Sequence, residues 1–352
     1  MKIIKTDILI IGGGPTGLFT VFEAGLLGLK CHIIDALSKP GGQCSEIYPK
    51  KPIFDIPAIP EILAGNLINN LLEQIKPFNP GYTLSESADY LEKQKDGSFN
   101  VVTEKGTVHN AKVIAIAGGL GSFDPRKPQI DNINKYEANG VEYMVKNPKL
   151  FKNKTIIISG GGDSALDWTI ELQKIARKVT LVHRRTEFRG AYDSIEKVQK
   201  LKNAQLIDVI TPAEVIELKG EKKLESVNIK LNGSKKEINT DFFIPLFGLI
   251  PKLGKISDWG LEIRKNAICV NNALDYQTNI PGIFAIGDIN TYPGKLKLIL
   301  CGFHEATLMC QAAFKIIHPN KKNILRYTTV TGVNGFDGSK RKSESATIKS
   351  IE

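Results

Sequence analysis

Cysteine is scarce in this sequence and is not arranged for metal binding or for dithiol chemistry. The 352 residues include five cysteines, and no two of them are separated by two residues. Zinc sites, iron–sulfur clusters and C-x-x-C redox pairs need sulfurs paired over one tight turn, so we expect none of these and no metal site. Unpaired cysteines in a long chain favour a reducing, cytoplasmic compartment. They are Cys31, Cys44, Cys269, Cys301 and Cys310.

Long apolar runs are also missing. The first apolar stretch, Ile8–Ile11, lies between Asp7 and Gly12, whereas a membrane-spanning helix needs about 20 apolar residues. We therefore expect no membrane span and no secretory leader. No basic stretch is interleaved with aromatic residues, which argues against nucleic acid as a partner.

The overall composition is that of an ordinary globular protein. Hydrophobic residues make up 42% and charged residues 24% of the chain, so we expect a soluble folded protein. At about 100 to 200 residues per domain, the length predicts two or three domains. The formal net charge of +10 favours anionic partners such as phosphorylated cofactors and acidic proteins.

The beginning of the chain has the pattern of a strand, a glycine turn, a helix and a second strand. The apolar run Ile3–Ile11 predicts a strand, and Leu18–Leu27 predicts a helix after the glycines. Lys30–Ile34 predicts a second strand, which ends at Asp35. These segments make up one β-α-β unit.

The same pattern returns in the middle of the chain. Thr155–Ser159 and Lys178–Val182 read as strands, and Leu166–Ile175 reads as the helix between them. Two dinucleotide-binding folds in tandem are therefore indicated. Further strands are expected at Phe99–Thr103, Thr107–Ile116, Ala213–Leu218, Leu224–Leu231, Asp241–Phe247 and Gly282–Ala285, and a further helix at Gly302–Ile317.

The first glycine turn fits the G-x-G-x-x-G pattern of dinucleotide sites. Gly12 would make the tight turn, Gly14 would let the backbone approach a pyrophosphate, and Gly17 would allow close helix packing. Asp35 is placed to accept hydrogen bonds from the adenosine ribose, and its carboxylate would repel a 2′-phosphate. This first site therefore suits FAD or NAD rather than NADP.

The second glycine turn ends differently. Ala165 replaces the last glycine, which is tolerated because only a small side chain must fit there. Where the first unit has an acid, the second has a basic cluster, and guanidinium groups at this place would bind a 2′-phosphate and favour NADP. The alternative interpretation of the cluster is a solvated basic loop. The candidate residues of this site are Gly160, Gly162, Asp163, Ser164, Ala165, His183, Arg184, Arg185 and Arg189.

Two small-residue bends mark the crossings between the predicted domains. Ala117-Gly118-Gly119 is the first and Gly248–Pro251 is the second. We therefore predict an α/β fold of two Rossmann-like domains, with the domain that suits NADP inserted into the domain that suits FAD or NAD. The predicted boundaries are 1–119 and 248–331 for the first domain, which the resemblance described next makes the FAD-binding domain, 120–247 for the NADP-binding domain, and 332–352 for a flexible C-terminal tail.

These motifs together resemble the ferredoxin–NADP reductases of the thioredoxin-reductase-like type, over roughly residues 5 to 331. The resemblance is carried by G-G-G-P-T-G-L from Gly12, G-G-Q from Gly41, G-G-G-D-S-A from Gly160 and H-R-R-x-x-F-R from His183. Y-P-x-K from Tyr48 and A-I-G-D ending at Asp288 complete the set.

The resemblance implies which further residues contact FAD. Tyr48 would lie against one face of the flavin ring and Tyr327 against the other. Asp288 would bind the ribityl chain or the pyrophosphate, and the hydroxyl of Thr329 would reach the flavin or the diphosphate. The remaining implied FAD contacts are Thr16, Gln43, Ala88 and Phe123.

The resemblance also separates this chain from thiol-dependent relatives. Thioredoxin reductases carry C-x-x-C in the inserted domain, where this chain has Glu137–Glu142 without cysteine. Glutathione-reductase-like enzymes carry two cysteines five residues apart, where this chain has Cys44 and Pro49. We therefore interpret Cys44 as a packing residue rather than a redox nucleophile.

The function implied is that of a flavoenzyme that takes hydride from NADPH and passes single electrons to ferredoxin or flavodoxin. Both carriers are acidic, so a basic chain would attract them. A homodimer is implied by the resemblance. The alternative is an NADPH-dependent disulfide or quinone reductase of the same fold, and a non-enzymatic nucleotide sensor is the third hypothesis.

Overall fold

The structure is a computed structural model, and it describes residues 3–121, 124–145, 147–250, 252–271, 274–322, 328 and 332–333. The chain divides into two compact units. The first unit is made of Met1–Ser122 and Lys252–Glu352, and the second is Phe123–Pro251. The second unit is thus an insertion in the sequence of the first.

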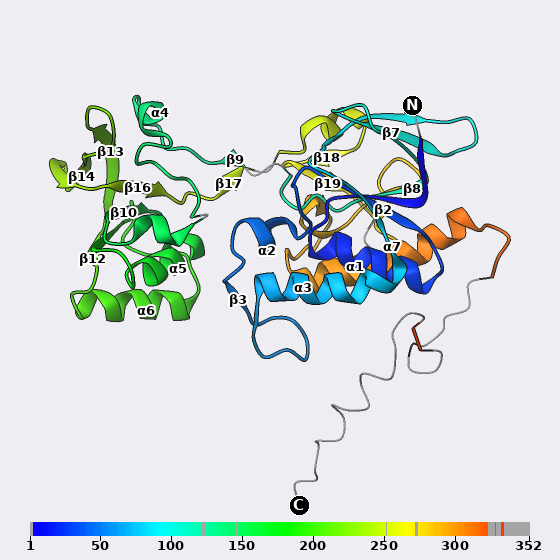
Figure 1. Cartoon of the computed structure of the whole chain (residues 1–352), viewed down its shortest axis with the longest axis horizontal. Coiled ribbons are helices and arrows are strands. Elements are labelled where there is room, and N and C mark those ends of the chain that lie inside the picture. Colours follow the sequence, from blue (N-terminus) through cyan, green and yellow to red (C-terminus); the bar gives the residue numbers. More distant parts are fainter. Residues whose placement is uncertain are drawn as a thin grey trace, which may run out of the picture. The chain divides into compact units, whose positions relative to one another are not determined.

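A largely parallel sheet forms the centre of the first unit (Figure 1). β1 (Ile4–Ile11) pairs in parallel with β2 (Cys31–Asp35) on one side and with β8 (Val108–Ile116) on the other. The strand order is β5-β2-β1-β8-β7-β6, and β20 also pairs with β8. The other strands of this sheet are β5 (Gly81–Leu84), β6 (Ala88–Lys93), β7 (Phe99–Thr103) and β20 (Ile283–Ala285).

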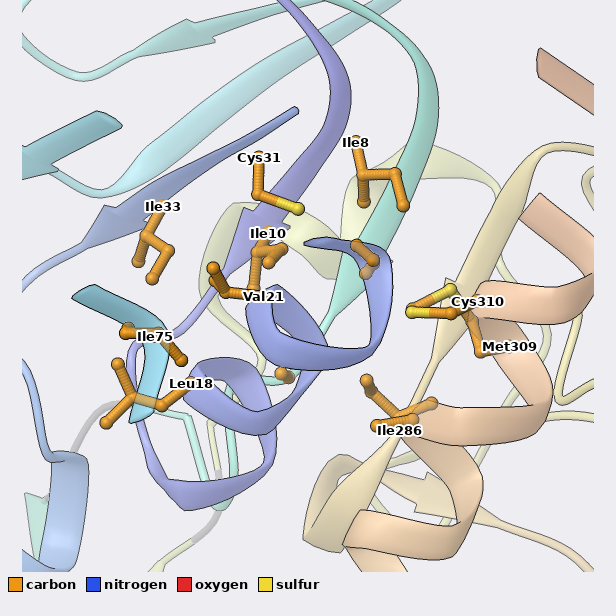
Figure 2. Packing of buried hydrophobic residues seen from close by; sticks show 14 of the residues in the cluster. Ile8, Ile10, Leu18, Val21, Cys31, Ile33, Ile75, Ile286, Met309 and Cys310 are labelled. Atoms are coloured by element: carbon orange, nitrogen blue, oxygen red, sulfur yellow. The ribbon is translucent and has the colours of Figure 1, made fainter. Parts of the chain in front are cut away.

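Three helices pack together beside this sheet. α1 (Pro15–Leu26) contacts both α3 (Ala64–Ile75) and α7 (Ile299–Ile317), as Figure 1 shows. Figure 2 shows the cluster in which they meet the strands, and burying each such aliphatic side chain stabilises the fold by about 2 kcal/mol. Its labelled members are Ile8, Ile10, Leu18, Val21, Cys31, Ile33, Ile75, Ile286, Met309 and Cys310.

Alternate residues of β1 enter two different cores. Ile8 and Ile10 belong to the cluster with the helices, whereas Leu9 and Ile11 belong to a second cluster with Trp259. All four strand residues are buried. A central parallel strand is covered on both faces, which is why its sequence reads as a continuous apolar run rather than an alternating one.

The remaining elements of the first unit are short. β3 pairs with β4, and β19 joins β18 to β21. These elements are α2 (Gly42–Glu46), β3 (Pro52–Ile53), β4 (Ile62–Leu63), η1 (Lys76–Phe78), η3 (Gly254–Trp259), β18 (Ile263–Arg264), β19 (Ala267–Cys269), η4 (Gly287–Ile289) and β21 (Asn290–Thr291).

The second unit repeats the design of the first with a smaller parallel sheet. Its strand order is β12-β11-β10-β16. Along β10, Ile157 enters one core while Ile156 and Ile158 enter the other. The elements are β10 (Thr155–Ser159), α5 (Asp163–Leu172), β11 (Lys178–Val182), α6 (Tyr192–Asn203), β12 (Asp208–Ile210) and β16 (Phe242–Pro245).

An antiparallel sheet of three strands, β13-β14-β15, completes the second unit. Val227 and Ile229 of β14 are fully buried and pack in the same core as Ile157. The remaining elements are β9 (Asp124–Pro125), α4 (Ile133–Tyr136), η2 (Pro148–Phe151), β13 (Ala213–Lys219), β14 (Ser226–Leu231), β15 (Ser234–Asn239) and β17 (Leu249–Ile250).

A buried group of three polar side chains links β2, β5 and β8. His32 Nε2 lies 2.8 Å from Thr83 Oγ1, and the same oxygen lies 2.9 Å from His109 Nε2. Burial, with a smaller contribution from His109, lowers the pKa of His32 to about 4, and burial also lowers the pKa of His109. The Thr83 hydroxyl therefore donates to one neutral ring and accepts from the other.

Protonation of His32 should be visible in the pH dependence of the free energy of unfolding. The pKa of His32 is lower in the folded chain than the ordinary value of 6.5, so protonation favours unfolding. The contribution of neutral His32 is complete above about pH 6.5 and is lost as the pH falls toward about 4. Between pH 8 and pH 5, urea unfolding should show that wild type loses about 2 kcal/mol more stability than His32→Gln, in which His109 still titrates.

The exposed His304 provides the matched control. We expect His304→Gln to keep the wild-type pH dependence of the free energy of unfolding. If His32→Gln and wild type lost stability in parallel over this range, the proton uptake would have to be assigned to other groups.

Candidate functional site

The first glycine turn connects β1 to α1 through two positions that exclude a side chain. Gly12 has φ +107°, and a Cβ there would lie 2.5 Å from the carbonyl oxygen of Ala117. A Cβ on Gly17 would lie 2.0 Å from the carbonyl oxygen of Gly12. Glycine at these places lets α1 begin directly at the end of β1.

Gly14 differs because nothing lies within 4 Å of the place where its Cβ would be. It is the N-cap of α1, it has extended backbone angles, and no side chain caps the helix. The first turn of a helix carries unpaired N–H groups and a partial positive charge. The open side of Gly14 is therefore suited to the close approach of a phosphate.

Asp35 lies at the end of β2, against the same turn. Its Oδ2 accepts a hydrogen bond of 2.6 Å from the N–H of Gly13, and its Oδ1 accepts one of 2.8 Å from Leu37. Burial raises the pKa of this carboxyl, while the two backbone hydrogen bonds oppose that rise. Each carboxylate oxygen can accept a further hydrogen bond.

The short helix α2 brings a second set of side chains to this turn. The N–H of Gly41 donates to the carbonyl of Gly13 at 2.7 Å, and a Cβ on Gly42 would lie 3.1 Å from Cα of Gly14. A Cβ on Gly119 would lie 3.4 Å from Nε2 of Gln43. Gln43 is thus near the bend after β8.

Cys44 and Tyr48 follow in the same segment. Cys44 is 2% exposed, and its Sγ donates to the hydroxyl of Tyr48 at 4.0 Å. Burial raises the pKa of the Cys44 thiol to about 11 and raises the pKa of the half-buried Tyr48 hydroxyl. The charge of Asp288 also contributes to both shifts.

Asp288 lies in η4, directly after β20. Gly287 before it has φ +76°, and a Cβ there would lie 3.0 Å from Oγ1 of Thr16. Burial raises the pKa of Asp288, and the positive charges of Lys295 and Lys297 oppose that rise. The structure therefore brings Thr16 of the glycine turn beside the turn that carries Asp288.

The other candidate residues of the first site fall in different places. Ala88 is 7% exposed and packs in the second core of the unit, at the start of β6. Phe123, Tyr327 and Thr329 lie outside the described residues.

The second glycine turn connects β10 to α5 in the same manner. A Cβ on Gly160 would lie 2.6 Å from the carbonyl oxygen of Leu246, and Ala165 is fully buried against this turn. Gly162 is the N-cap of α5 and has nothing within 4 Å of its Cβ position. Each unit thus has one glycine whose missing side chain leaves open space at a helix N-terminus.

The loop after β11 folds back on this turn. The N–H of Arg189 donates to the carbonyl of Gly161 at 2.7 Å, and Oδ1 of Asp163 accepts from the N–H of Ala191 at 2.7 Å. The neighbouring Ser164 lies in the first turn of α5, where its side chain is exposed. The loop and the helix N-terminus therefore form one surface.

The buried ring of His183 lies between the glycine turn and this loop. A Cβ on Gly161 would lie 2.2 Å from the imidazole, and the ring stacks on Phe188 with centroids 5.4 Å apart. Its Nε2 lies 3.1 Å from the carbonyl oxygen of Glu187. Burial and the nearby Arg184 and Arg189 lower the pKa of His183. The neutral ring donates to the loop, and the exposed charges come from the arginines.

Arg184, Arg185 and Arg189 are exposed. Arg184 and Arg185 line an open hollow of about 440 Å³. Sequence reasoning did not identify the other residues that line this hollow, because they come from β13, β14 and the residues next to these strands, which form a separate sheet. The other lining residues are Pro212, Ala213, Glu214, Lys230, Asn232 and Gly233.

All five cysteines are described, and all are free thiols. Cys31 and Cys310 lie in the core of the first unit (Figure 2), where burial raises their thiol pKa. Over the described part of the chain, no group of three or more His, Cys, Asp or Glu side chains could hold a metal ion. Nor does that part contain a helix long and apolar enough to cross a membrane.

Comparison with known proteins extends these observations. Residues 6–306 match the family described as pyridine nucleotide-disulphide oxidoreductase. The chain is 67% identical to a ferredoxin–NADP reductase of Flavobacterium johnsoniae, over 99% of both chains. It is 50% identical to a ferredoxin–NADP reductase of Mesorhizobium japonicum, over 93% of this chain and 95% of the relative.

The fold agrees with this relationship. The crystal structure of Lactococcus lactis thioredoxin reductase is similar with a TM-score of 0.76 and 26% identity, over 89% of this chain and 99% of that one. The predicted α/β fold of two Rossmann-like domains is thereby confirmed. The chain is a member of the pyridine nucleotide-disulphide oxidoreductase family, and within it of the ferredoxin–NADP reductases.

Proposed function

We propose that this protein is a FAD-dependent oxidoreductase that transfers electrons between NADPH and ferredoxin. The observation that carries the proposal is the full-length identity of 67% with a protein of that name. The different side chains at the end of the second strand of each β-α-β unit also support the proposal. One ends in a carboxylate, Asp35, and the other ends in exposed arginines.

The first unit has the features that FAD needs. The open space at Gly14 fits a pyrophosphate, and Asp35 can accept from ribose hydroxyls. Gly287, directly before Asp288, lies beside Thr16, and the charge of Asp288 acts on Tyr48. Tyr48 is then the residue on one face of the flavin, and Tyr327 stays the prediction for the other. When bound, FAD supplies a flavin that accepts hydride from NADPH and releases its electrons singly.

The remaining FAD contacts are proposed on the same basis. Gly12 and Gly17 shape the turn, and Gln43 borders the bend at Gly119. Ala88, Phe123 and Thr329 stay proposals from the family resemblance. We assign FAD binding to the unit of residues 1–122 and 252–352.

We assign NADPH binding to the unit of residues 123–251. The open side of Gly162 fits the pyrophosphate, and the first turn of α5 with Asp163 and Ser164 surrounds it. Arg184, Arg185 and Arg189 are exposed where a 2′-phosphate needs bidentate donors. His183 holds the loop that carries them.

The partner proposed is ferredoxin, with flavodoxin as a second acceptor of the same chemistry. The formal net charge of +10 favours encounter with a small acidic protein, and such steering weakens with salt. A homodimer and a cytoplasmic location are proposed from the family resemblance and from the unpaired cysteines.

Rapid-mixing spectroscopy tests the proposal. The FAD-loaded protein is reduced with NADPH and then mixed with ferredoxin, flavodoxin, thioredoxin or a quinone. We expect ferredoxin or flavodoxin to reoxidise the flavin fastest at low salt. Faster reoxidation by thioredoxin or by the quinone would favour the disulfide or quinone reductase, and a protein that cannot bind FAD would contradict both.

Replacing Cys44 by serine separates the two closest hypotheses. The thiol is buried, its pKa is raised to about 11, and Tyr48 is its hydrogen-bond partner, so it is not a thiolate nucleophile at neutral pH. We expect Cys44→Ser to keep NADPH-to-ferredoxin turnover within about threefold, the modest effect of changing a small buried side chain. Turnover and flavin content are measured on the same sample.

A large loss of turnover at unchanged flavin content would make Cys44 catalytic. Cys310→Ser, a change at a buried thiol in the core between α1 and α7, is the control for packing effects.

A further inference from the structure

Glu305 is a fully buried carboxylate in α7. Sequence reasoning gave it no role. Its side chain is 1% exposed and pairs with Lys295, whose side chain is 6% exposed. A buried ion pair recovers its desolvation cost only when further hydrogen bonds satisfy both groups. The surroundings of Glu305 supply such bonds.

Each of the two carboxylate oxygens of Glu305 accepts hydrogen bonds from two donors. Oε2 accepts from the N–H of Gly287 at 2.7 Å and from Nδ2 of Asn290 at 2.8 Å. Oε1 accepts from the hydroxyl of Tyr292 at 2.8 Å and from Nζ of Lys295. All four donors come from the single segment between β20 and α7.

The segment 287–295 is therefore fastened to α7 through one side chain. Asn290 also donates to the carbonyl of Ala285 at 2.9 Å, which ties the segment to the end of β20. The Lys295 ammonium lies 5.3 Å from the centroid of the Tyr292 ring, a cation–π distance. An alternative conformation of the segment would break several of these contacts at once.

The fastened segment carries Asp288. Gly287, whose N–H donates to Glu305, precedes Asp288 and lies against Thr16 of the glycine turn. The charges of Lys295 and Glu305 both act on Asp288 and in opposite directions. Glu305 therefore contacts both the backbone of the turn that carries Asp288 and a lysine whose charge acts on Asp288.

We propose that Glu305 is a positioning residue of the flavin site: it fixes the Gly287–Asp288 turn by accepting from the Gly287 N–H, and it neutralises Lys295. The inference rests on the proposed FAD binding and assigns this role to a side chain that lies behind the site.

Two double variants of equal charge test the hydrogen bond. Lys295→Met/Glu305→Gln keeps an acceptor for Gly287 and Asn290, and its amide N–H group can donate to Tyr292. Lys295→Met/Glu305→Met has no such acceptor. Neither variant leaves an unpaired buried charge, so both avoid the large penalty of a single charge deletion.

FAD is titrated into the flavin-free full chain of each variant. We expect Lys295→Met/Glu305→Gln to bind FAD within about threefold of wild type, and Lys295→Met/Glu305→Met to bind about 10- to 100-fold more weakly. Glu23→Gln, a change at a half-buried glutamate of α1, is the control and should bind as wild type. Equal affinity of the two double variants would overturn the hydrogen-bonding role.

Glu305→Gln alone tests the neutralising role. It leaves the Lys295 ammonium without its carboxylate beside Asp288, and an added positive charge favours a reduced, anionic flavin. We expect the midpoint potential of bound FAD to rise in Glu305→Gln and to return toward the wild-type value in Lys295→Met/Glu305→Gln. A potential equal to wild type in the single variant would overturn this role.

The wild-type titration separates the two proposals. If the wild-type protein does not bind FAD, the proposed function itself fails. If wild type binds FAD and the two double variants bind alike, only the role of Glu305 fails.

Discussion

Replacing Arg184 and Arg185 by alanine together is expected to lower kcat/KM for NADPH by about two to four orders of magnitude. Both side chains are exposed after β11, where the adenosine ribose of a dinucleotide lies in this fold. Each charge-assisted hydrogen bond to the 2′-phosphate contributes roughly 1.5 to 3 kcal/mol. NADH lacks that phosphate, so kcat/KM for NADH should change little.

The measurement is steady-state reduction of ferredoxin with each nucleotide, at constant ionic strength. Lys222→Ala/Lys223→Ala is the control, since these exposed lysines of the same unit remove the same charge elsewhere. It should leave the ratio of NADPH to NADH activity unchanged. Equal losses with NADPH and NADH in the arginine variant would show that the basic loop does not read the phosphate.

The two units carry side chains of opposite charge on the same backbone design. The last residue of β2 is Asp35, whose carboxylate accepts from the N–H of Gly13. After β11 the chain places His183, whose neutral ring lies against Gly161 and holds the loop of the arginines. In each case a residue at the carboxyl end of the second strand, Asp35 within β2 or His183 just after β11, contacts the middle of the glycine turn.

The sequence was sufficient for the two β-α-β units because their signals are local. The strands Thr155–Ser159 and Lys178–Val182 of the second unit have the predicted bounds. The helices after the glycine turns begin three residues earlier than predicted, at Pro15 and Asp163. The extended backbone of the N-cap residues Gly14 and Gly162 sets the start of each helix. Neither helix has a capping side chain, so the sequence carried no cap signal for that start.

Four α-helices of the described residues were not predicted: the short α2 and α4, and the longer α3 and α6. The two longer helices were missed for different reasons. In α3, Leu67, Ile68, Leu71 and Ile75 are buried at helical spacing, so a signal was present and was missed. In α6 the only buried residue is Val198, so most of the helix carries no apolar period. Such a helix is stabilised by its neighbours and by exposed ion pairs more than by a pattern that a sequence displays.

The site was predictable where residues follow one another and not where the fold brings them together. The spacing of the glycines and the position of Asp35 at the end of the second strand are visible in the sequence and predict a dinucleotide site. The burial of Glu305 could not be predicted in this way, because no sequence pattern near a single glutamate in an apolar helix shows which groups pair with it. Its four donors lie between Gly287 and Lys295, and only the structure places them at the carboxylate.

Replacing Gly14 by valine is expected to abolish FAD binding while leaving a folded chain. Nothing lies within 4 Å of its Cβ position, and its backbone angles suit any residue. The cost to stability should be about 1 kcal/mol, the difference between glycine and a branched residue at an N-cap. The new side chain would occupy the space that a pyrophosphate needs, so FAD affinity should fall at least about 100-fold, as for any lost close approach of charged groups.

Gly162→Val is the matched control, because Gly162 is the open N-cap glycine of α5 in the other unit. It should raise KM for NADPH strongly and leave FAD content at the wild-type level, whereas Gly14→Val should lose FAD and keep the fold of the flavin-free chain. Flavin content, circular dichroism and urea unfolding are measured on both. If Gly14→Val bound FAD as wild type does, the pyrophosphate could not lie at the β1–α1 turn. Both assignments would then have to be exchanged or abandoned, because the same open-glycine geometry supports each of them.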